Sequence, residues 1–323
     1  MKTPLLSCFR FLTLLSIVCA LGCSRQGAQL EDIEGIRSLK VKHSPPTAFS
    51  ELAWSPDGRY VAARAYVGRN NSAVTVIDLQ TGETRRLYES RGDYLLGPKW
   101  SPDGQSLVFY TPRSQANPRS GGLVIVDAET GGIIRDFGFG VRATWTTDSE
   151  HIIMVEFSSS CEKTVSIDDY NLVTDSNRTI GTTGSCSPET TNSLDVSVDG
   201  KLVVPGIDGV YSQILDIADG TSLGTLNPTG GSTVWSPDGT MLAFITKKMV
   251  SSTPTDSIIL ASADGSCLSE PLELNSYLYS VDWSPDGSRL VFSNRDVNRL
   301  YFLDLATGVG KELMDSYRER CTG

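Results

Sequence analysis

The sequence Trp54-Ser-Pro-Asp-Gly58 occurs four times in this chain, with further copies beginning at Trp100, Trp235 and Trp283. Two weaker copies begin at Trp145 and Val196, which completes a series of six at spacings of 46, 45, 51, 39 and 48 residues. All five tryptophans of the chain stand at the first position of the motif. A period of about 45 residues is the length of a four-stranded propeller blade. Most of the 323 residues therefore form one small unit that is repeated six times.

The composition of the motif predicts a tight turn between two strands. Pro56 presets φ for the second position of a turn, Asp57 suits the next, and Gly58 accepts the positive φ that returns the chain to a strand. Trp54 has an area of about 200 Å² with which to fill the gap between neighbouring blades. The first unit is expected to contain strands at 49–54, 59–67, 73–79 and 84–89, which form an antiparallel meander.

A second signature recurs about 20 to 27 residues after the first, where an aspartate ends an apolar strand and a glycine turn follows. Clear copies carry Asp78, Asp127, Asp216 and Asp304, and looser ones lie at 167–169 and 261–265. Because the aspartate returns at the same place in each unit, we interpret it as a hairpin cap and assign it no chemistry.

The predicted fold is an all-β, six-bladed propeller of four-stranded antiparallel blades that covers residues 35–323. The outer strand of the last blade is ambiguous, because both 36–41 and 311–314 have the pattern of an outer strand. One terminus commonly completes the blade of the other and so hides an edge. We favour the N-terminal strand as the partner of the sixth unit, inside or outside 311–314.

The N-terminus predicts export from the cytoplasm. Lys2 and Arg10 precede an apolar run at 11–21, the layout of a secretory signal peptide over residues 1–22. The segment Ala20-Leu-Gly-Cys23 resembles the cleavage box of bacterial lipoproteins, although the family's leucine is one place late. This resemblance implies a lipid on Cys23, an outer-membrane destination because Ser24 follows it, and a tether over 23–34. An ordinary cleaved signal peptide is the alternative, and a retained anchor is weaker because a span needs about 20 apolar residues.

Net charge limits the classes of binding partner, and the cysteine content limits the possible disulfides. The formal charge is −10, and without residues 1–22 it is −12, from 26 basic and 38 acidic side chains. Such a surface disfavours nucleic acid and anionic lipid. Export permits disulfides among the four cysteines that remain after residue 23. Cys161 and Cys186 fall on one face of the third unit and are the candidate pair, whereas Cys267 and Cys321 start on opposite faces, with nothing to direct them together.

The repeats resemble those of the TolB-like propeller family, which carries Trp-Ser-Pro-Asp-Gly between the first two strands of each blade. Four intact and two degraded copies support this resemblance over roughly residues 35–317. It implies a periplasmic protein-binding module, or the propeller that precedes the hydrolase of prolyl-oligopeptidase-like peptidases. Only a short tail follows the sixth unit here. The second possibility therefore lacks the domain that carries its nucleophile.

Searches for catalytic and metal-binding patterns identify no candidate, and we expect no cofactor. Gly220-Thr-Ser-Leu-Gly224 matches the nucleophile-elbow pattern but falls where the repeat requires a hairpin. The only histidines, His43 and His151, both precede Ser222, which is contrary to the order in that hydrolase fold. They stand 108 residues apart, without ligands at metal-binding spacing.

Binding residues are expected where loops enter the inner strands around the channel. The candidates are Asp93, Tyr94, Arg142, Tyr277 and Tyr279. Tyrosine and arginine are favoured interface anchors, although Tyr277 and Tyr279 alternate along a strand, which favours packing between blades over ligand contact for these two. Charged residues also stand directly before the motif, where most neighbours are apolar; these are Lys99, Asp195 and Asp282. Interblade ion pairs and ligand contacts explain them equally well.

The leading hypothesis is an exported, lipid-anchored, non-catalytic propeller that binds or scaffolds another protein of the bacterial envelope. Two alternatives stay open. One is an enzyme or binder that acts on a glycan or peptide at the channel, and the other is a spacer in a larger surface assembly.

Overall fold

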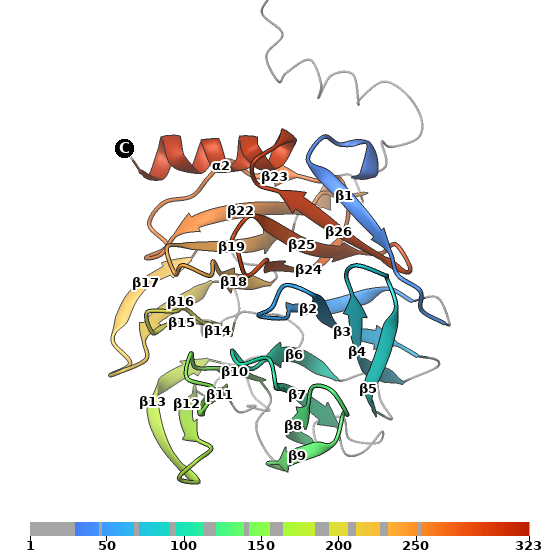
Figure 1. Ribbon diagram of the computed structural model, residues 1–323. Coiled ribbons are helices and arrows are strands. Elements are labelled where there is room, and N and C mark those ends of the chain that lie inside the picture. Colours follow the sequence, from blue (N-terminus) through green and yellow to red (C-terminus); the bar gives the residue numbers. More distant parts are fainter. Residues whose placement is uncertain are drawn as a thin grey trace, which may run out of the picture.

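Six four-stranded antiparallel sheets are arranged as blades around a central channel in the computed structural model (Figure 1). The structure describes residues 30–44, 47–67, 71–90, 95–112, 121–138, 142–155, 164–184, 194–205, 211–226, 232–247, 249–250 and 253–322. The six-bladed fold predicted from the repeats is confirmed. Cys23, Asp93, Tyr94, Cys161 and Cys186 lie outside the described residues.

The first three blades follow the chain from the inner to the outer strand. Blade 1 contains β2 (Phe49–Trp54), β3 (Tyr60–Tyr66), β4 (Ser72–Asp78) and β5 (Thr84–Ser90). Blade 2 contains β6 (Leu96–Trp100), β7 (Ser106–Pro112), β8 (Gly121–Asp127) and β9 (Ile133–Asp136). Blade 3 contains β10 (Arg142–Trp145), β11 (His151–Val155), β12 (Thr164–Asn171) and β13 (Ser176–Gly184). The strands of blade 1 begin and end within one residue of the ranges predicted from the sequence.

Blades 4 and 5 continue the same order. Blade 4 contains β14 (Asp195–Val196), β15 (Lys201–Pro205), β16 (Ser212–Asp216) and β17 (Ser222–Leu226). Blade 5 contains β18 (Thr233–Trp235), β19 (Met241–Thr246), β22 (Ser257–Ser262) and the two-residue β23 (Leu272–Glu273). A small hairpin of β20 (Met249–Val250) and β21 (Thr253–Pro254) lies between the second and third strands of blade 5. The literal nucleophile-elbow pattern falls in the β16–β17 hairpin of blade 4, as expected.

Blade 6 closes the ring with strands from both ends of the chain. Its order is β24 (Leu278–Trp283), β25 (Arg289–Asn294), β26 (Arg299–Asp304) and β1 (Ile36–Lys40), and β1 pairs antiparallel with β26 from Ile36↔Leu303 to Lys40↔Arg299. The prediction that the N-terminal strand joins the sixth unit is confirmed. A 3-10 helix, η1 (Leu30–Asp32), precedes β1.

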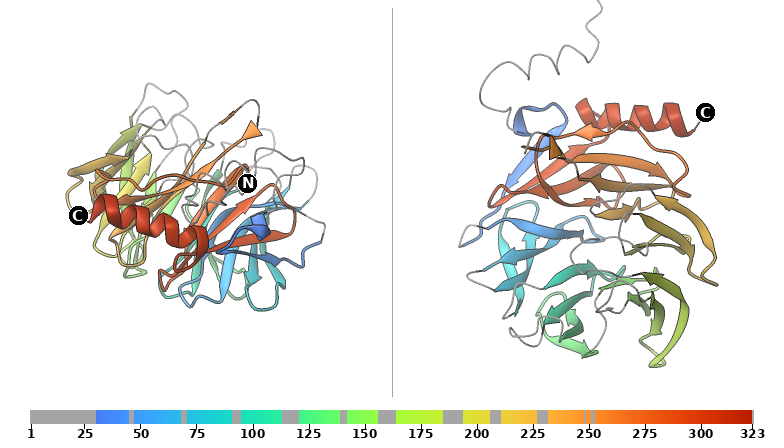
Figure 2. Two further views of the ribbon diagram at one scale, coloured as in Figure 1. Left: turned by 90° about the horizontal axis from the view of Figure 1, so that it is seen from above. Right: turned by 180° about the vertical axis from the view of Figure 1, so that it is seen from behind.

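The expectation that 311–314 has strand structure is wrong, because these residues lie in the helix α2 (Gly308–Cys321). β1 already occupies the free edge of β26, so the chain that follows does not pair with that strand. The helix instead runs along the outside of blades 5 and 6, with Leu313 and Tyr317 buried in the core that these blades share (Figure 2). Within the described residues, no helix combines the length and apolarity required to cross a membrane.

The disulfide between Cys267 and Cys321 corrects a second expectation. The two residues were placed on opposite faces with nothing to bring them together, yet the structure joins them. α2 is the missing element, because it returns the C-terminal segment to the third-strand turn of blade 5. Ser316 supports this course by accepting a hydrogen bond at Oγ from the Glu270 backbone N–H at 2.8 Å.

Each intact motif forms the turn that its composition predicts. In blade 1, Ser55 Oγ donates to Asp57 Oδ1 at 2.5 Å and accepts from the Tyr60 N–H at 2.8 Å, and Gly58 has a φ of +75°. The degraded copies keep the first contact, between Thr146 and Asp148 and between Ser197 and Asp199, each at 2.6 Å. The four-stranded unit is thus bent in the same way even where the tryptophan is lost.

Candidate functional site

The inner strands place two rings of side chains around the channel, in register with the motif. The residues three places before its first position are Glu51, Gly97, Arg142, Ser232 and Ser280, and those one place before it are Ala53, Lys99, Thr144, Asp195, Val234 and Asp282. Both rings contain charged residues from several blades. They are close enough together to form ion pairs between blades that are not neighbours.

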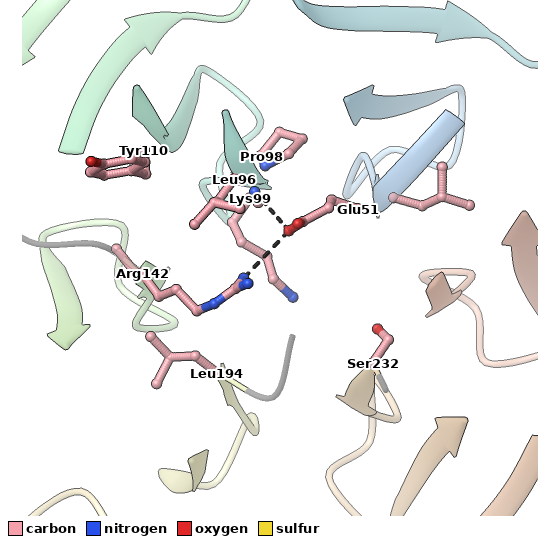
Figure 3. A pocket seen from close by; sticks show the side chains of 11 residues that line it. Glu51, Leu96, Pro98, Lys99, Tyr110, Arg142, Leu194 and Ser232 are labelled. Carbon is pink, nitrogen blue, oxygen red and sulfur yellow. Dashed lines mark hydrogen bonds and ion pairs between the residues drawn. The ribbon is translucent and has the colours of Figure 1, made fainter. Parts of the chain in front are cut away.

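Glu51 and Arg142 form one of these pairs across the channel. Arg142 Nη1 lies 3.4 Å from Glu51 Oε2, and the same oxygen accepts a hydrogen bond from the Gly97 N–H at 2.8 Å (Figure 3). The side chains of Glu51 and Arg142 are only 9% and 13% exposed. Glu51 has a φ of +54°, in the left-handed region that a side chain other than glycine, asparagine or aspartate seldom adopts. The bulged strand β2 therefore holds its backbone in an unfavourable conformation while its carboxylate bridges blades 2 and 3.

Lys99 and Asp195 form the second pair, from blade 2 to blade 4. Lys99 Nζ lies 3.3 Å from Asp195 Oδ1, and Asp195 Oδ2 accepts from the Trp235 N–H at 2.9 Å. Asp282 has the matching position in blade 6, where its Oδ2 accepts from the Trp54 N–H at 2.6 Å. Each aspartate therefore binds the first motif residue of the next blade in the ring.

The pKa values of this cluster follow from its depth in the ring. Burial raises the pKa of Asp282 to about 6, although the Lys99 cation and the Trp54 N–H oppose the rise. Burial alone would lower the pKa of Lys99, but Asp195 and Asp282 outweigh it, so the net pKa is raised. Lys99 therefore stays charged at neutral pH, which keeps its ion pair with Asp195 intact.

Glu51, Lys99 and Arg142 line a pocket at the channel centre whose cavity volume is about 30 Å³. That volume is enough for one or two water molecules, whereas sites for organic ligands have about 300–1,000 Å³. Of the described residues, none forms a group of three or more His, Cys, Asp or Glu side chains suited to a metal ion. At this level, charged side chains fill the channel.

Tyr277 and Tyr279 are brought together, but away from this pocket, whose lining does not include them. Their rings meet edge to face with centroids 5.4 Å apart. Of the three candidates that the structure describes, Arg142 lines the pocket at the channel centre and the two tyrosines do not, and the binding roles of all five candidates stay predictions. Glu51 was missed by sequence reasoning, although its place three residues before Trp54 matches the place of Arg142 before Trp145.

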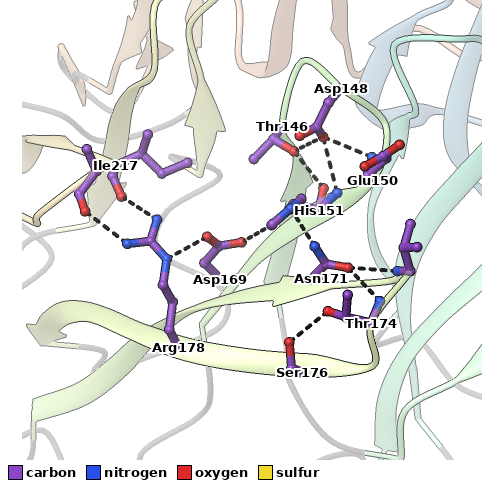
Figure 4. Close-up of polar contacts among 12 residues, drawn as sticks. Thr146, Asp148, Glu150, His151, Asp169, Asn171, Thr174, Ser176, Arg178 and Ile217 are labelled. Carbon is purple, nitrogen blue, oxygen red and sulfur yellow. Dashed lines mark hydrogen bonds and ion pairs between the residues drawn. The ribbon is translucent and has the colours of Figure 1, made fainter.

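His151 is held in a polar network on blade 3 (Figure 4). Its Nδ1 lies 2.7 Å from Asp169 Oδ1 and its Nε2 lies 2.8 Å from Asn171 Nδ2. Since the Asn171 amide donates to Nε2, the proton sits on Nδ1, and the ring is neutral in this arrangement. Arg178 links Asp169 to the Ile217 and Ala218 carbonyls of blade 4. The network joins two blades and leaves neither ring nitrogen free for catalysis.

Together, the fold and the channel define a six-bladed β-propeller of the TolB-like type. Its structure is similar to that of TolB from Acinetobacter baumannii, with a TM-score of 0.53 and 24% identity over 68% of this chain and 53% of that chain. A chain in a crystal structure of the mitotic checkpoint complex gives a TM-score of 0.54 at 18% identity and covers 83% of this chain and 94% of that one. At such identities the likeness shows the fold alone.

Sequence comparisons add little to the structural ones. No protein-family model matches the chain. A stretch of 86 residues is 29% identical to dipeptidyl-peptidase 5 of Porphyromonas gingivalis, which amounts to 24% of this chain and 13% of that protein. The matched stretch thus spans a small part of the peptidase.

Proposed function

We propose that the protein is a non-catalytic propeller that binds another protein of the bacterial cell envelope and is anchored there by a lipid on Cys23. The observation that carries the first part is the filled channel. The pairs Glu51–Arg142 and Lys99–Asp195 leave a cavity of about 30 Å³, in which no organic substrate has room. This favours binding at the outer surfaces of the ring over binding in this cavity.

The likeness to TolB supports this proposal through the fold, and the likeness to dipeptidyl-peptidase 5 does not oppose it, because it covers 13% of that protein. An enzyme that acts on a glycan or peptide at the channel is the competing function. A screen of the mature protein against hydrolase and lyase substrates separates the two. Turnover that is lost in Arg142→Gln or Lys99→Gln would place an active site at the channel and contradict the proposed function.

The partner is tested by chemical crosslinking in the producing bacterium, followed by purification of the tagged full chain from membrane extracts. We expect one envelope protein to be enriched over a tagged, unrelated lipoprotein carried through the same steps. Failure to enrich any protein across growth conditions and crosslinker lengths would contradict the proposed function.

The anchor is tested by Cys23→Ser. Loss of the thiol should abolish incorporation of a labelled fatty acid and move the protein from the membrane to the soluble envelope fraction. Cys267→Ser is the matched control, because it removes a cysteine elsewhere and should leave acylation unchanged. Membrane association that is unaffected by Cys23→Ser would rule out the lipid anchor.

A further inference from the structure

Aromatic and cationic side chains gather on the face opposite the motif turns, over blades 5, 6 and 1. Tyr66 ends β3, Arg295 follows β25, and Tyr277 and Tyr279 stand at the start of β24. Arg64 precedes Tyr66 on the same strand. We call these five residues the tyrosine–arginine rim.

Contacts between rings and guanidinium groups hold the rim together. The Arg295 guanidinium carbon lies 4.7 Å from the centroid of the Tyr277 ring, and that of Arg64 lies 4.8 Å from the Tyr66 ring. Burial raises the pKa of Tyr279, although the charge of Arg295 and its hydrogen bond to Tyr279 oppose the rise. Blades 1 and 6, which carry the rim, are neighbours, because β2 packs against β24 and β25. Tyr66 is 40% exposed and Arg295 is also exposed, so the rim reaches solvent.

The positive charges of the rim have no ion-pair partner among the described residues. Of the ion pairs among described residues, none includes Arg64 or Arg295. Arg64 Nε is buried without a hydrogen-bond partner there. The nearest carboxylate in sequence, Asp296, is already bound by Asn294 Nδ2 at 3.0 Å and by the Tyr301 hydroxyl. A buried donor without a partner carries a cost that a ligand oxygen could remove.

A third cation makes the contrast clear. Lys247 Nζ lies 4.1 Å from the centroid of the Tyr277 ring, where Arg295 also stacks, but Asp256 neutralises it at 3.0 Å. Asp256 thus gives Lys247 a counterion, and Arg295 has no ion pair of this kind among the described residues. Arginine binds carboxylates through paired N–H donors, which makes a carboxylate the natural ligand for two guanidinium groups that form no ion pair with a described residue.

We infer that the tyrosine–arginine rim binds an acidic segment of a partner polypeptide, with Arg64 and Arg295 holding its carboxylates and the tyrosine rings packing against the side chains between them. The inference rests on the proposed function and names the chemistry of the partner. The net charge of the chain is −10, so an acidic segment gains no general attraction to the protein and its binding depends on local cations such as those of the rim. Tyrosine and arginine are also the residue types that dominate binding energy at interfaces.

The test uses the mature full chain and a short fluorescein-labelled peptide of alternating glutamate and alanine, with binding followed by fluorescence anisotropy. We expect saturable binding that weakens at high salt. Arg295→Gln should reduce the affinity about tenfold, because it removes a charge-assisted hydrogen bond. Arg64→Gln should act in the same direction. Arg59→Gln is the matched control, since Arg59 stacks on Tyr60 at 4.9 Å beside the motif turn on the opposite face.

Three outcomes overturn the inference. They are equal binding of a peptide in which glutamine replaces glutamate, an equal loss with Arg59→Gln, and an unchanged affinity in Arg295→Gln. A photocrosslinking amino acid at position 277 or at position 60 separates this result from the proposed function. Partner capture from position 60 alone contradicts the acidic-segment site but leaves a protein-binding propeller in place.

Discussion

At the scale of single residues, the carboxylates of this protein divide into two kinds. Those in the motif turns are exposed and accept hydrogen bonds from the turn; in one of these turns the bonds from Ser284 and Ser288 lower the pKa of Asp286 to about 2. Asp282 lies deep in the ring, and burial brings its pKa to about 6. The same residue type thus contributes to stability with opposite pH dependence.

The first prediction concerns Asp282→Asn. The folded-state pKa of about 6 exceeds the ordinary value of 3.8, so wild-type protein binds a proton on folding between these values and loses stability as pH rises from about 4 to 6. The shift corresponds to at most about 3 kcal/mol. Asparagine keeps an acceptor for the Trp54 N–H without the buried charge. We expect the variant to unfold at higher urea than wild type at pH 7.5, with the difference vanishing near pH 4.

Asp286→Asn is the control, and its expected change in stability has the opposite sign. Its folded-state pKa lies below the ordinary value, so its contribution is present above pH 4 and is lost as pH falls toward 2. This variant should be less stable than wild type at pH 7.5. If both variants change stability in the same direction at pH 7.5, burial is not what separates the two aspartates.

At the scale of elements, α2 packs on the outside of blade 5, where the other blades have a longer outer strand. Blade 5 has an outer strand of only two residues, β23, and α2 packs against its neighbour β22 as well as β26 of blade 6. The helix end is fixed twice, by the Cys267–Cys321 disulfide and by the ion pair of Arg320 with Glu270. We call these two links the C-terminal clasp. It holds the end of α2 against blade 5.

The second prediction concerns this clasp. Reduction, or the double change Cys267→Ser and Cys321→Ser, should lower the free energy of unfolding by about 2–4 kcal/mol, because a loop of 54 residues is no longer closed in the unfolded chain. Chemical denaturation with and without reductant measures it. The double serine variant should show no further effect of reductant; if it does, another bond is being reduced. A non-reducing peptide map that lacks the 267–321 link would contradict the clasp itself.

At the scale of the whole molecule, tryptophan side chains lie at the interfaces between neighbouring blades, which we call seams. Trp145 Nε1 donates to the Lys99 carbonyl of blade 2 at 3.1 Å, and Trp100 Nε1 donates to the Ala53 carbonyl of blade 1 at the same distance. Trp235 Nε1 is buried without a hydrogen-bond partner among the described residues. The tryptophan seams are therefore alike in packing but unequal in hydrogen bonding.

The third prediction compares Trp145→Phe with Trp235→Phe. The two rings are similarly buried, at 7% and 5% exposure, so both changes lose similar packing. Only Trp145→Phe also leaves the Lys99 carbonyl without its donor, which costs about 1–2 kcal/mol more. Urea denaturation of both variants gives the difference. Equal destabilisation would show that the seam bond adds nothing to packing.

Several features of this protein could be predicted from the sequence because they depend on local chemistry repeated at a fixed period. The motif fixes a turn, the turn fixes the ends of strands β2 to β5, and the period fixes six blades. The same register places Lys99, Asp195 and Asp282, which come from alternate blades, at one level of the channel. Glu51 was not predicted, because no residue near it in the sequence indicates the β-bulge in which its φ is +54°.

Other features were decided only by the tertiary structure. Which charges pair across the channel depends on the blades that face each other, so Lys99 meets Asp195 instead of an acid from its own unit. The structure of the C-terminal segment depends on the pairing of β1 with the free edge of β26. With that edge paired, the segment forms a helix that brings Cys321 to Cys267. The local pattern sets each blade because its contacts are near in sequence, whereas pairing across the ring depends on contacts that exist only once the ring has closed.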